Sequence, residues 1–179
     1  AGKGVIGICG GYQMLCRTLS DPYEVEEGGQ MKGLGLLEAD TVFEQQKERT
    51  RVKGSFGRVD GLFAPLSGKT FEGYEIHMGR TGAEGQNMVA TLVDGEGREK
   101  PDGLCHGNVL GTYVHGIFDS DEVLTALAHS LAAHKGIGYD PAAVYDVAAY
   151  KQREYDKLAD LLRQSLDMPL VYDILDKGV

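Results

Sequence analysis

The segment that most restricts the fold is a short apolar run, Gly4–Cys9 (GVIGIC), near the start of the chain. A continuous apolar run of this length is typical of a parallel strand that is buried on both faces. Two glycines end the run, and Tyr12–Leu19 then predicts a helix that stops at Asp21-Pro22. The chain therefore opens with a strand and a helix, as α/β proteins do.

The middle of the chain predicts strands, and its last third predicts helices. Tyr23–Lys32 is polar and contains glycine, which predicts a loop. The expected strands are Leu34–Phe43, Arg51–Val59, Phe71–Met78, Met88–Val93 and Val109–His115. Helices are expected at Ser120–Ala133 and Tyr150–Leu166. This order predicts a single α/β domain over residues 1–179, with a mixed central sheet.

Charge and composition exclude several classes of partner. The formal net charge is −9, from 18 basic and 27 acidic side chains, which repels phosphate backbones, so we expect no nucleic acid partner. No apolar run approaches the roughly 18 residues that span a bilayer, so we expect no membrane partner either. The 3 cysteines lack metal-ligand spacing. They predict a protein with no metal site in a reducing, cytoplasmic setting.

Cys9 lies between the predicted strand and helix and is the candidate nucleophile. A nucleophile elbow needs a sharp turn at this point, and small residues at Gly7 and Gly11 would remove its steric clashes. The start of the following helix favours a thiolate, and the Gly10 N–H is placed to stabilise an oxyanion. The alternative is a tight strand–helix turn with an inert buried thiol. Cys16 and Cys105 have no such setting and are interpreted as structural.

A thiol nucleophile needs a base, and imidazole suits this role near neutral pH. His115 ends a predicted strand, at the sheet edge where the catalytic groups of α/β folds collect, and is our candidate. His77 is the other serious candidate. The remaining histidines lie in predicted helices or in a glycine-rich loop: His106, His129 and His134.

The pattern Gly7-x-Cys9-x-Gly11-x-Gln13 resembles the signature of class I glutamine amidotransferases. The resemblance implies a flavodoxin-like mixed central sheet flanked by helices. It also implies that the cysteine attacks the side-chain amide of glutamine, and that Gln13 contacts this substrate.

One part of the family pattern is missing. The family usually has His-x-Glu, whereas this chain has His115-Gly116-Ile117, so the pattern does not identify the third catalytic group. Glu75 or Asp119 could orient the imidazole, or the site could work as a Cys–His dyad. In lacking the Glu of His-x-Glu, the chain resembles a subgroup of the family: cobyric acid synthases, cobyrinic acid a,c-diamide synthases and the glutaminase partner of the lipid II amidating ligase.

Three further stretches resemble cobyric acid synthases most closely: Gly73–Thr81, Gly111–Asp119 and Tyr150–Leu162. The resemblance implies that the chain supplies ammonia to an amidoligase domain of the same polypeptide. That domain would use ATP and Mg²⁺ to amidate carboxylates of a corrinoid. The chain itself has no GxxxxGK[ST] phosphate loop, so no cofactor is expected in it. The rival interpretations are a hydrolase acting on another acyl substrate, and a non-catalytic regulatory or scaffold domain.

Glutamine carries an α-carboxylate and an α-ammonium group that the site must hold. We expect Gln13, Glu75, His77 and Arg80 to bind the substrate. Arg80 would pair with the carboxylate, and Glu75 would take the ammonium group. The alternative for Arg80 and Glu75 is that both are simply solvated at the surface.

The chain begins at Ala1, without Met, and enters the first strand almost at once. We therefore expect a fold truncated at its N-terminus. In the resembling enzymes a second oxyanion donor comes from a glycine-rich loop upstream of the nucleophile strand. Because this chain would lack that donor, we expect it to be a weak or inactive glutaminase alone.

Overall fold

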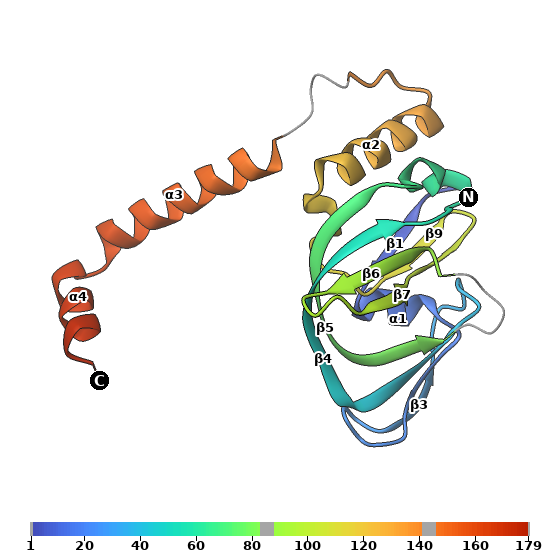
Figure 1. Ribbon diagram of the computed structural model, residues 1–179, viewed down its shortest axis with the longest axis horizontal. Helices are drawn as coiled ribbons and strands as arrows, with labels where there is room; N and C mark the ends of the chain where they lie inside the picture. The colour runs from blue at the N-terminus through green and yellow to red at the C-terminus, as the bar shows by residue number, and fades with distance from the viewer. Residues whose placement is uncertain (1, 83–87, 141–145, 179) are drawn as a thin grey trace. The chain divides into compact units, whose positions relative to one another are not determined.

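The computed structural model describes residues 2–82, 88–140 and 146–178 (Figure 1). They fall into two compact units, Ala1–Ala143 and Val144–Val179, which are described separately.

The first unit contains a three-stranded sheet in the order β1-β9-β8. Its strands are β1 (Val5–Ile8), β9 (Val109–Thr112) and β8 (Leu104–His106). β1 and β9 are parallel, with Ile8 opposite Thr112, so the chain leaves both strands at the same end of the sheet. The predicted parallel strand is confirmed. The prediction that this strand is buried on both faces is wrong, because β1 is an edge strand whose Val5 is exposed.

A larger mixed sheet has the order β3-β2-β4-β6-β7, with β5 also paired to β4. Its strands are β2 (Thr18–Asp21), β3 (Gly29–Lys32), β4 (Asp40–Phe56), β5 (Thr70–Gly82), β6 (Ala90–Asp94) and β7 (Glu99–Asp102). β2 and β4 are parallel, and the other pairs are antiparallel. The predicted α/β class with mixed sheets and flanking helices is confirmed.

Four α-helices and two short 3₁₀ helices complete the described parts. The first unit holds α1 (Gly10–Leu15), α2 (Asp121–Lys135), η1 (Gly61–Leu66) and η2 (Ile117–Asp119). The second unit holds α3 (Val147–Ser165) and α4 (Met168–Lys177). In the part of the chain that the structure describes, no helix is long and apolar enough to cross a membrane.

The helix predicted over Tyr12–Leu19 is shorter than expected, because α1 ends at Leu15 and the chain then enters β2. A later loop occupies the last carbonyl groups of the helix: Leu34 N–H donates to Met14 O at 2.8 Å, and Leu36 N–H donates to Leu15 O at 2.9 Å. The loop predicted over Tyr23–Lys32 is partly wrong, since its last four residues form β3.

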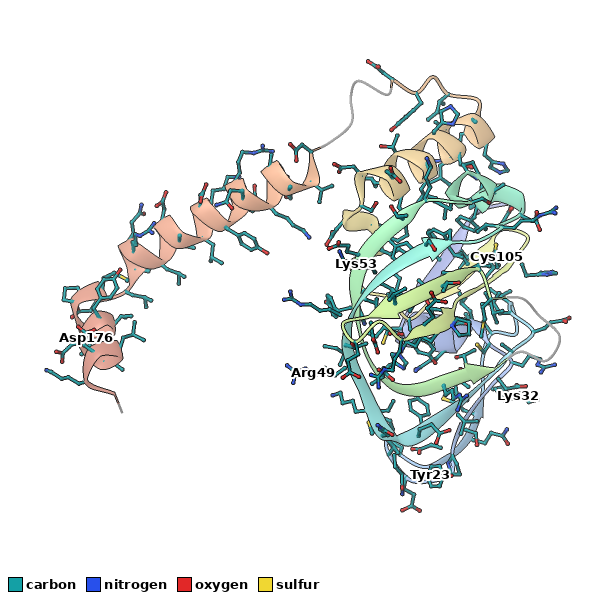
Figure 2. The ribbon with its side chains drawn as sticks, in the orientation of Figure 1. Tyr23, Lys32, Arg49, Lys53, Cys105 and Asp176 are labelled. Atoms are coloured by element: carbon teal, nitrogen blue, oxygen red, sulfur yellow. The ribbon has the colours of Figure 1, made fainter. Side chains whose placement is uncertain are left out.

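The turn between β2 and β3 is organised by Asp21, which ends a strand rather than a helix. Its carboxylate accepts three backbone N–H groups, from Val25, Glu26 and Gly28, at 2.8–3.0 Å. These hydrogen bonds lower the pKa of Asp21 although burial opposes them. Tyr23 lies exposed at the tip of this turn (Figure 2).

The two strands predicted at Leu34–Phe43 and Arg51–Val59 are largely one long strand, β4. β5 provides a partner along its length, from Asp40 opposite Gly82 to Ser55 opposite Thr70, with one irregularity between Phe43 and Glu48. β7, β8 and α4 were not predicted. β7 is polar and contains a proline (EKPD), which hides it from a search for apolar alternation.

Two hydrophobic clusters fix the elements that carry the candidate site. The larger joins β4, β5 and β6 to β9 and α2, with Val52, Phe71, Leu92, Leu110 and Val123 among its members. The smaller packs α1 against β8 and the segment after β9, and includes Tyr12, Leu15, Leu104 and Tyr113. The residues directly after β1 and β9 are therefore held by buried neighbours.

Candidate functional site

Cys9 lies in a sharp turn between β1 and α1. Its backbone has φ 53° and ψ −113°, a sparsely populated positive-φ conformation that costs a non-glycine residue about 1–3 kcal/mol. Two hydrogen bonds hold it there: Cys9 N–H donates to Thr112 O at 2.9 Å, and Gln13 N–H donates to Cys9 O at 3.1 Å. The half-buried thiol is thus presented at the start of a helix by a strained, well-anchored turn.

Gly7 makes this turn possible. A Cβ at Gly7 would lie 2.6 Å from Leu15 Cδ1 and 2.7 Å from the carbonyl of Gly11, so a larger residue would push α1 off β1. The steric need predicted for Gly11 is wrong, because a Cβ there would meet nothing within 4 Å. The close approach involves the backbone of Gly11 and the missing side chain of Gly7.

His115 follows β9 by three residues and is attached to β5. His115 N–H donates to Tyr74 O at 2.9 Å, and Tyr74 N–H donates to His115 O at 3.1 Å. The imidazole stacks on the Tyr74 ring, with ring centroids 5.0 Å apart and planes inclined by 7°. Both the backbone and the ring of His115 are therefore positioned by one residue of β5.

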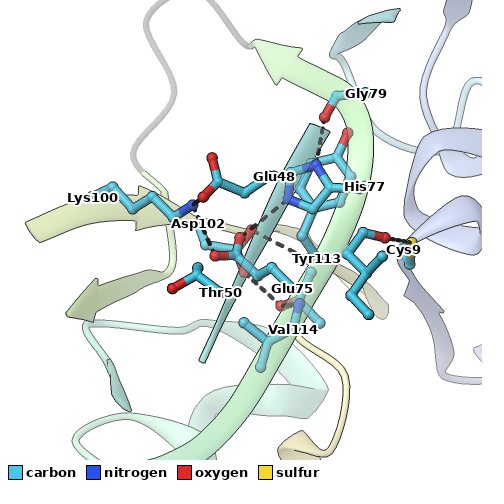
Figure 3. A network of polar contacts seen from close by, with 12 residues as sticks. Cys9, Glu48, Thr50, Glu75, His77, Gly79, Lys100, Asp102, Tyr113 and Val114 are labelled. Atoms are coloured by element: carbon cyan, nitrogen blue, oxygen red, sulfur yellow. Dashed lines mark hydrogen bonds and ion pairs between the residues drawn. The ribbon is translucent and has the colours of Figure 1, made fainter. Parts of the chain in front are cut away.

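Cys9 and His115 reach the same stretch of β5. The Cys9 thiol donates a weak hydrogen bond to Ile76 O, with Sγ 3.7 Å from the oxygen (Figure 3). Ile76 is two residues from Tyr74, about 6.6 Å along the strand. Because β1 and β9 are parallel neighbours, the residues after both strands emerge at one end of the sheet. Cys9 and His115 therefore contact β5 at positions two residues apart.

The side chains of Glu75 and His77 lie on the other side of β5 from Cys9 (Figure 3). Glu75 is only 2% exposed; Lys100 Nζ is 2.8 Å from its Oε2 and His77 Nε2 is 3.3 Å from its Oε1. His77 Nδ1 is 2.8 Å from Gly79 O, so both of its ring nitrogens face oxygen acceptors. This arrangement makes His77 a member of a buried network rather than a base for Cys9.

Asp102 belongs to the same network, beneath β9. It accepts hydrogen bonds from Thr112 Oγ1 at 2.5 Å and from Tyr113 N–H at 3.2 Å. The Tyr113 ring stacks on His77, with centroids 3.8 Å apart. Sequence analysis did not find Lys100, Asp102 or Tyr113, because nothing in their local sequence signals a network assembled from β5, β7 and the end of β9.

The two buried carboxyl groups of the network differ in their ionisation. Burial alone would raise the pKa of Glu75, but the hydrogen bond from His77 and the positive charge of Lys100 outweigh burial and lower it. Burial raises the pKa of Asp102, and the nearby Glu75 charge adds to this shift. Glu75 is therefore the carboxylate that the network keeps ionised.

The remaining candidates for substrate binding are spread around the site. Gln13 is 7% exposed, and its amide packs so closely on Gly79 that a Cβ there would lie 2.2 Å from Gln13 Nε2. Arg80 is exposed and, with Glu75 and His77, lines a cavity of about 710 Å³. Gly10 is the first residue of α1, so its N–H directly follows the nucleophile.

A second cavity, of about 870 Å³, lies along the Tyr74 side of the sheet, where Arg51 and Asp119 also line it. Cys9 and His115 line neither cavity. The Asp119 carboxylate is near the residue that follows His115, 3.4 Å from the position of a Cβ on Gly116.

Three relatives of this chain carry the same name. A cobyric acid synthase from Ruminiclostridium cellulolyticum is 54% identical over 99% of this chain and 35% of its own length. Cobyric acid synthases from Lachnoclostridium phytofermentans and Dehalococcoides mccartyi strain 195 are 43% and 42% identical, over 98% and 100% of this chain and 36% of their own lengths. The chain thus spans about a third of the length of these relatives.

A solved glutamine amidotransferase from Thermotoga maritima is 17% identical, with a TM-score of 0.39, over 88% of this chain and 58% of that one. The family model of the CobB/CobQ-like glutamine amidotransferase domain matches residues 1–123, which include the elbow, β5 and the His115 segment. The chain therefore belongs to the CobB/CobQ-like glutamine amidotransferase family.

Proposed function

We propose that the chain hydrolyses glutamine at Cys9 and His115 and supplies ammonia for amidation. The strained backbone of Cys9, at the end of a parallel strand and at the start of a helix, is the observation that best supports this proposal. Strain of this kind persists where it serves chemistry, because a relaxed turn would present the thiol differently. His115, beyond the neighbouring parallel strand, supports the choice of base.

The proposed reaction proceeds through a thioester. His115 takes the Cys9 thiol proton, and the sulfur attacks the side-chain amide carbon of glutamine. The Gly10 N–H stabilises the negative oxygen of the tetrahedral intermediate. His115 then protonates the departing nitrogen, which leaves as ammonia, and a water molecule hydrolyses the thioester to release glutamate.

In the whole protein, we propose that the ammonia is used by an amidoligase domain of the same polypeptide. The relatives that this chain matches are named cobyric acid synthase and are about three times as long, which supports such a partner. That domain would amidate corrinoid carboxylates with ATP and Mg²⁺. The residues described in this chain hold and cleave glutamine in this scheme.

When a glutamine-analogue chloroketone is offered to the full-length protein, we expect it to label Cys9 and neither of the other two cysteines of this chain. Burial raises the pKa of Cys16, and it raises that of Cys105 to about 11, so both remain protonated near pH 7.5. Peptide mapping by mass spectrometry should find one adduct within this chain, on Cys9, and excess glutamine should prevent it. An adduct on Cys105, or labelling of Cys9 that glutamine does not slow, would contradict a glutamine site at the elbow.

Replacing Arg80 with Ala is expected to raise the glutamine KM about 10-fold or more, because a charged hydrogen bond to the α-carboxylate would be lost. Activity with free ammonia should not change. Arg51→Ala is the matched control: Arg51 is also exposed on a strand, but it lines the other cavity. A KM that rises in Arg51→Ala and not in Arg80→Ala would show that the glutamine carboxylate binds at the other cavity, beside Arg51.

A further inference from the structure

We propose that Tyr74 is a positioning residue for His115, in the role that a carboxylate has in His-x-Glu triads. This inference rests on the proposed function, since it needs His115 to be the base. Its evidence is the parallel stacking of the two rings, with centroids 5.0 Å apart and planes inclined by 7°. A parallel ring contact restricts rotation of the imidazole about its side-chain bonds and so defines where its nitrogens point.

The backbone of β5 fixes the same histidine. The backbones of Tyr74 and His115 exchange two hydrogen bonds, at 2.9 and 3.1 Å. These bonds fix where the imidazole ring lies along β5, next to the Tyr74 ring. This contact requires Gly73, because a Cβ at that position would lie 2.3 Å from His115 O and 2.5 Å from Val114 Cγ1. Three adjacent features of β5, the missing side chain, the backbone bridge and the ring, therefore act together on His115.

Glu75, one of the two carboxylates considered for this role, has other partners. It is ion-paired with Lys100 and hydrogen-bonded to His77 on the other side of β5 from Cys9 (Figure 3). Tyr74 precedes it in the strand, so the two side chains point to opposite faces. Ring stacking on Tyr74 also leaves the edge of the imidazole, with both nitrogens, available for proton transfer.

The stacked arrangement suits both protonation states of the base. When His115 holds the proton from Cys9 it is an imidazolium, and a cation over the face of a tyrosine ring is attracted by that ring. The phenol ring thus keeps its contact throughout the cycle. An orienting carboxylate in a triad does the same through a hydrogen bond, with charge in place of ring contact.

The test compares Tyr74→Leu and Tyr74→Phe in the full-length enzyme, with Tyr23→Leu as the matched control. Tyr74 and Tyr23 are 44% and 52% exposed, so neither replacement should change Tm by more than about 3 °C. We expect Tyr74→Leu to lower the glutamine-dependent kcat about 10- to 100-fold, as a misdirected base does, with KM within about 2-fold. Tyr74→Phe keeps the ring and should stay within about 3-fold of the wild type. Ammonia-dependent activity should not change in any of the three.

Two further variants make the outcomes distinct. If His115→Ala keeps its glutamine-dependent rate, the proposed function itself is wrong. If His115→Ala is inactive and Tyr74→Leu stays within about 3-fold of the wild type, the positioning role alone is overturned. The role is also overturned if Asp119→Asn loses as much rate as Tyr74→Leu, or if Tyr74→Phe is as slow as Tyr74→Leu.

Discussion

Cys9→Ser is expected to lower glutamine-dependent activity of the full-length enzyme by at least about 1000-fold, with ammonia-dependent activity unchanged. A serine hydroxyl is far harder to ionise than a thiol, so the attacking anion would be almost absent at neutral pH. The fold should survive, because the hydrogen bonds that hold the turn use the backbone of Cys9 and not its sulfur.

The control for this change is Cys105→Ser. Cys105 is also half-buried, and burial raises the pKa of its thiol to about 11, so we expect no role in attack and activity within about 3-fold. Both rates can be measured in one assay by offering either glutamine or ammonium chloride. Glutamine-dependent turnover that survives Cys9→Ser, or that disappears in Cys105→Ser, would show that the nucleophile has been misassigned.

Lys100→Met is expected to destabilise the first unit by about 3 kcal/mol at pH 7, measured by urea denaturation. Glu75 is 2% exposed, and Lys100 lies 2.8 Å from its Oε2. Without Lys100 the buried carboxylate keeps His77 as its remaining neighbour in the network, and an under-compensated buried charge is costly. Methionine preserves most of the side-chain volume, so the change isolates the loss of charge.

The pH dependence of this loss has a definite sign. The folded-state pKa of Glu75 is below its usual value, so its contribution to stability is present above about pH 4.3 and is lost as pH falls through the folded pKa. The difference between wild type and Lys100→Met should therefore be largest near neutral pH and shrink below pH 4.

Lys53→Met is the matched control for Lys100→Met. Lys53 projects from the surface of β4 (Figure 2), and it pairs with Glu72 at 3.1 Å, where both side chains are largely exposed. Solvent screens such a pair, so Tm should stay within about 2 °C of the wild type. Equal losses in the two lysine variants, or a Lys100→Met loss that does not change with pH, would rule out the buried Glu75 pair as the cause.

The strand–turn–helix around Cys9 was predictable from sequence because its causes are local. The small residue at Gly7, the apolar run before Cys9 and the helix after it are all visible within a dozen positions. The residue at which α1 ends could not be predicted in this way, because the N–H groups of the loop residues Leu34 and Leu36 donate to the last carbonyl groups of the helix. A propensity-based prediction cannot include a competitor that lies some twenty residues away.

The sequence also did not predict which side chains of β5 lie on each face of the strand. Glu75 and His77 were predicted to bind the substrate, and Tyr74 and Ile76, which alternate with them in the same short stretch, were not considered. Which pair faces Cys9 depends on the register of β5 against β4 and on the Tyr74–His115 bridge. Long-range pairing decides both, so the sequence alone could not assign these four residues to the two faces.

The two faces of β5 also restrict how this segment can change in length during evolution. A single-residue insertion or deletion next to Tyr74 would exchange the faces for part of the strand. It would turn Glu75 toward Cys9 and remove the ring that stacks on His115, and Lys100 would lose its ion pair with Glu75. Gains and losses of residues are therefore tolerable only outside Thr70–Gly82, and divergence within this strand has to proceed by substitution at constant length.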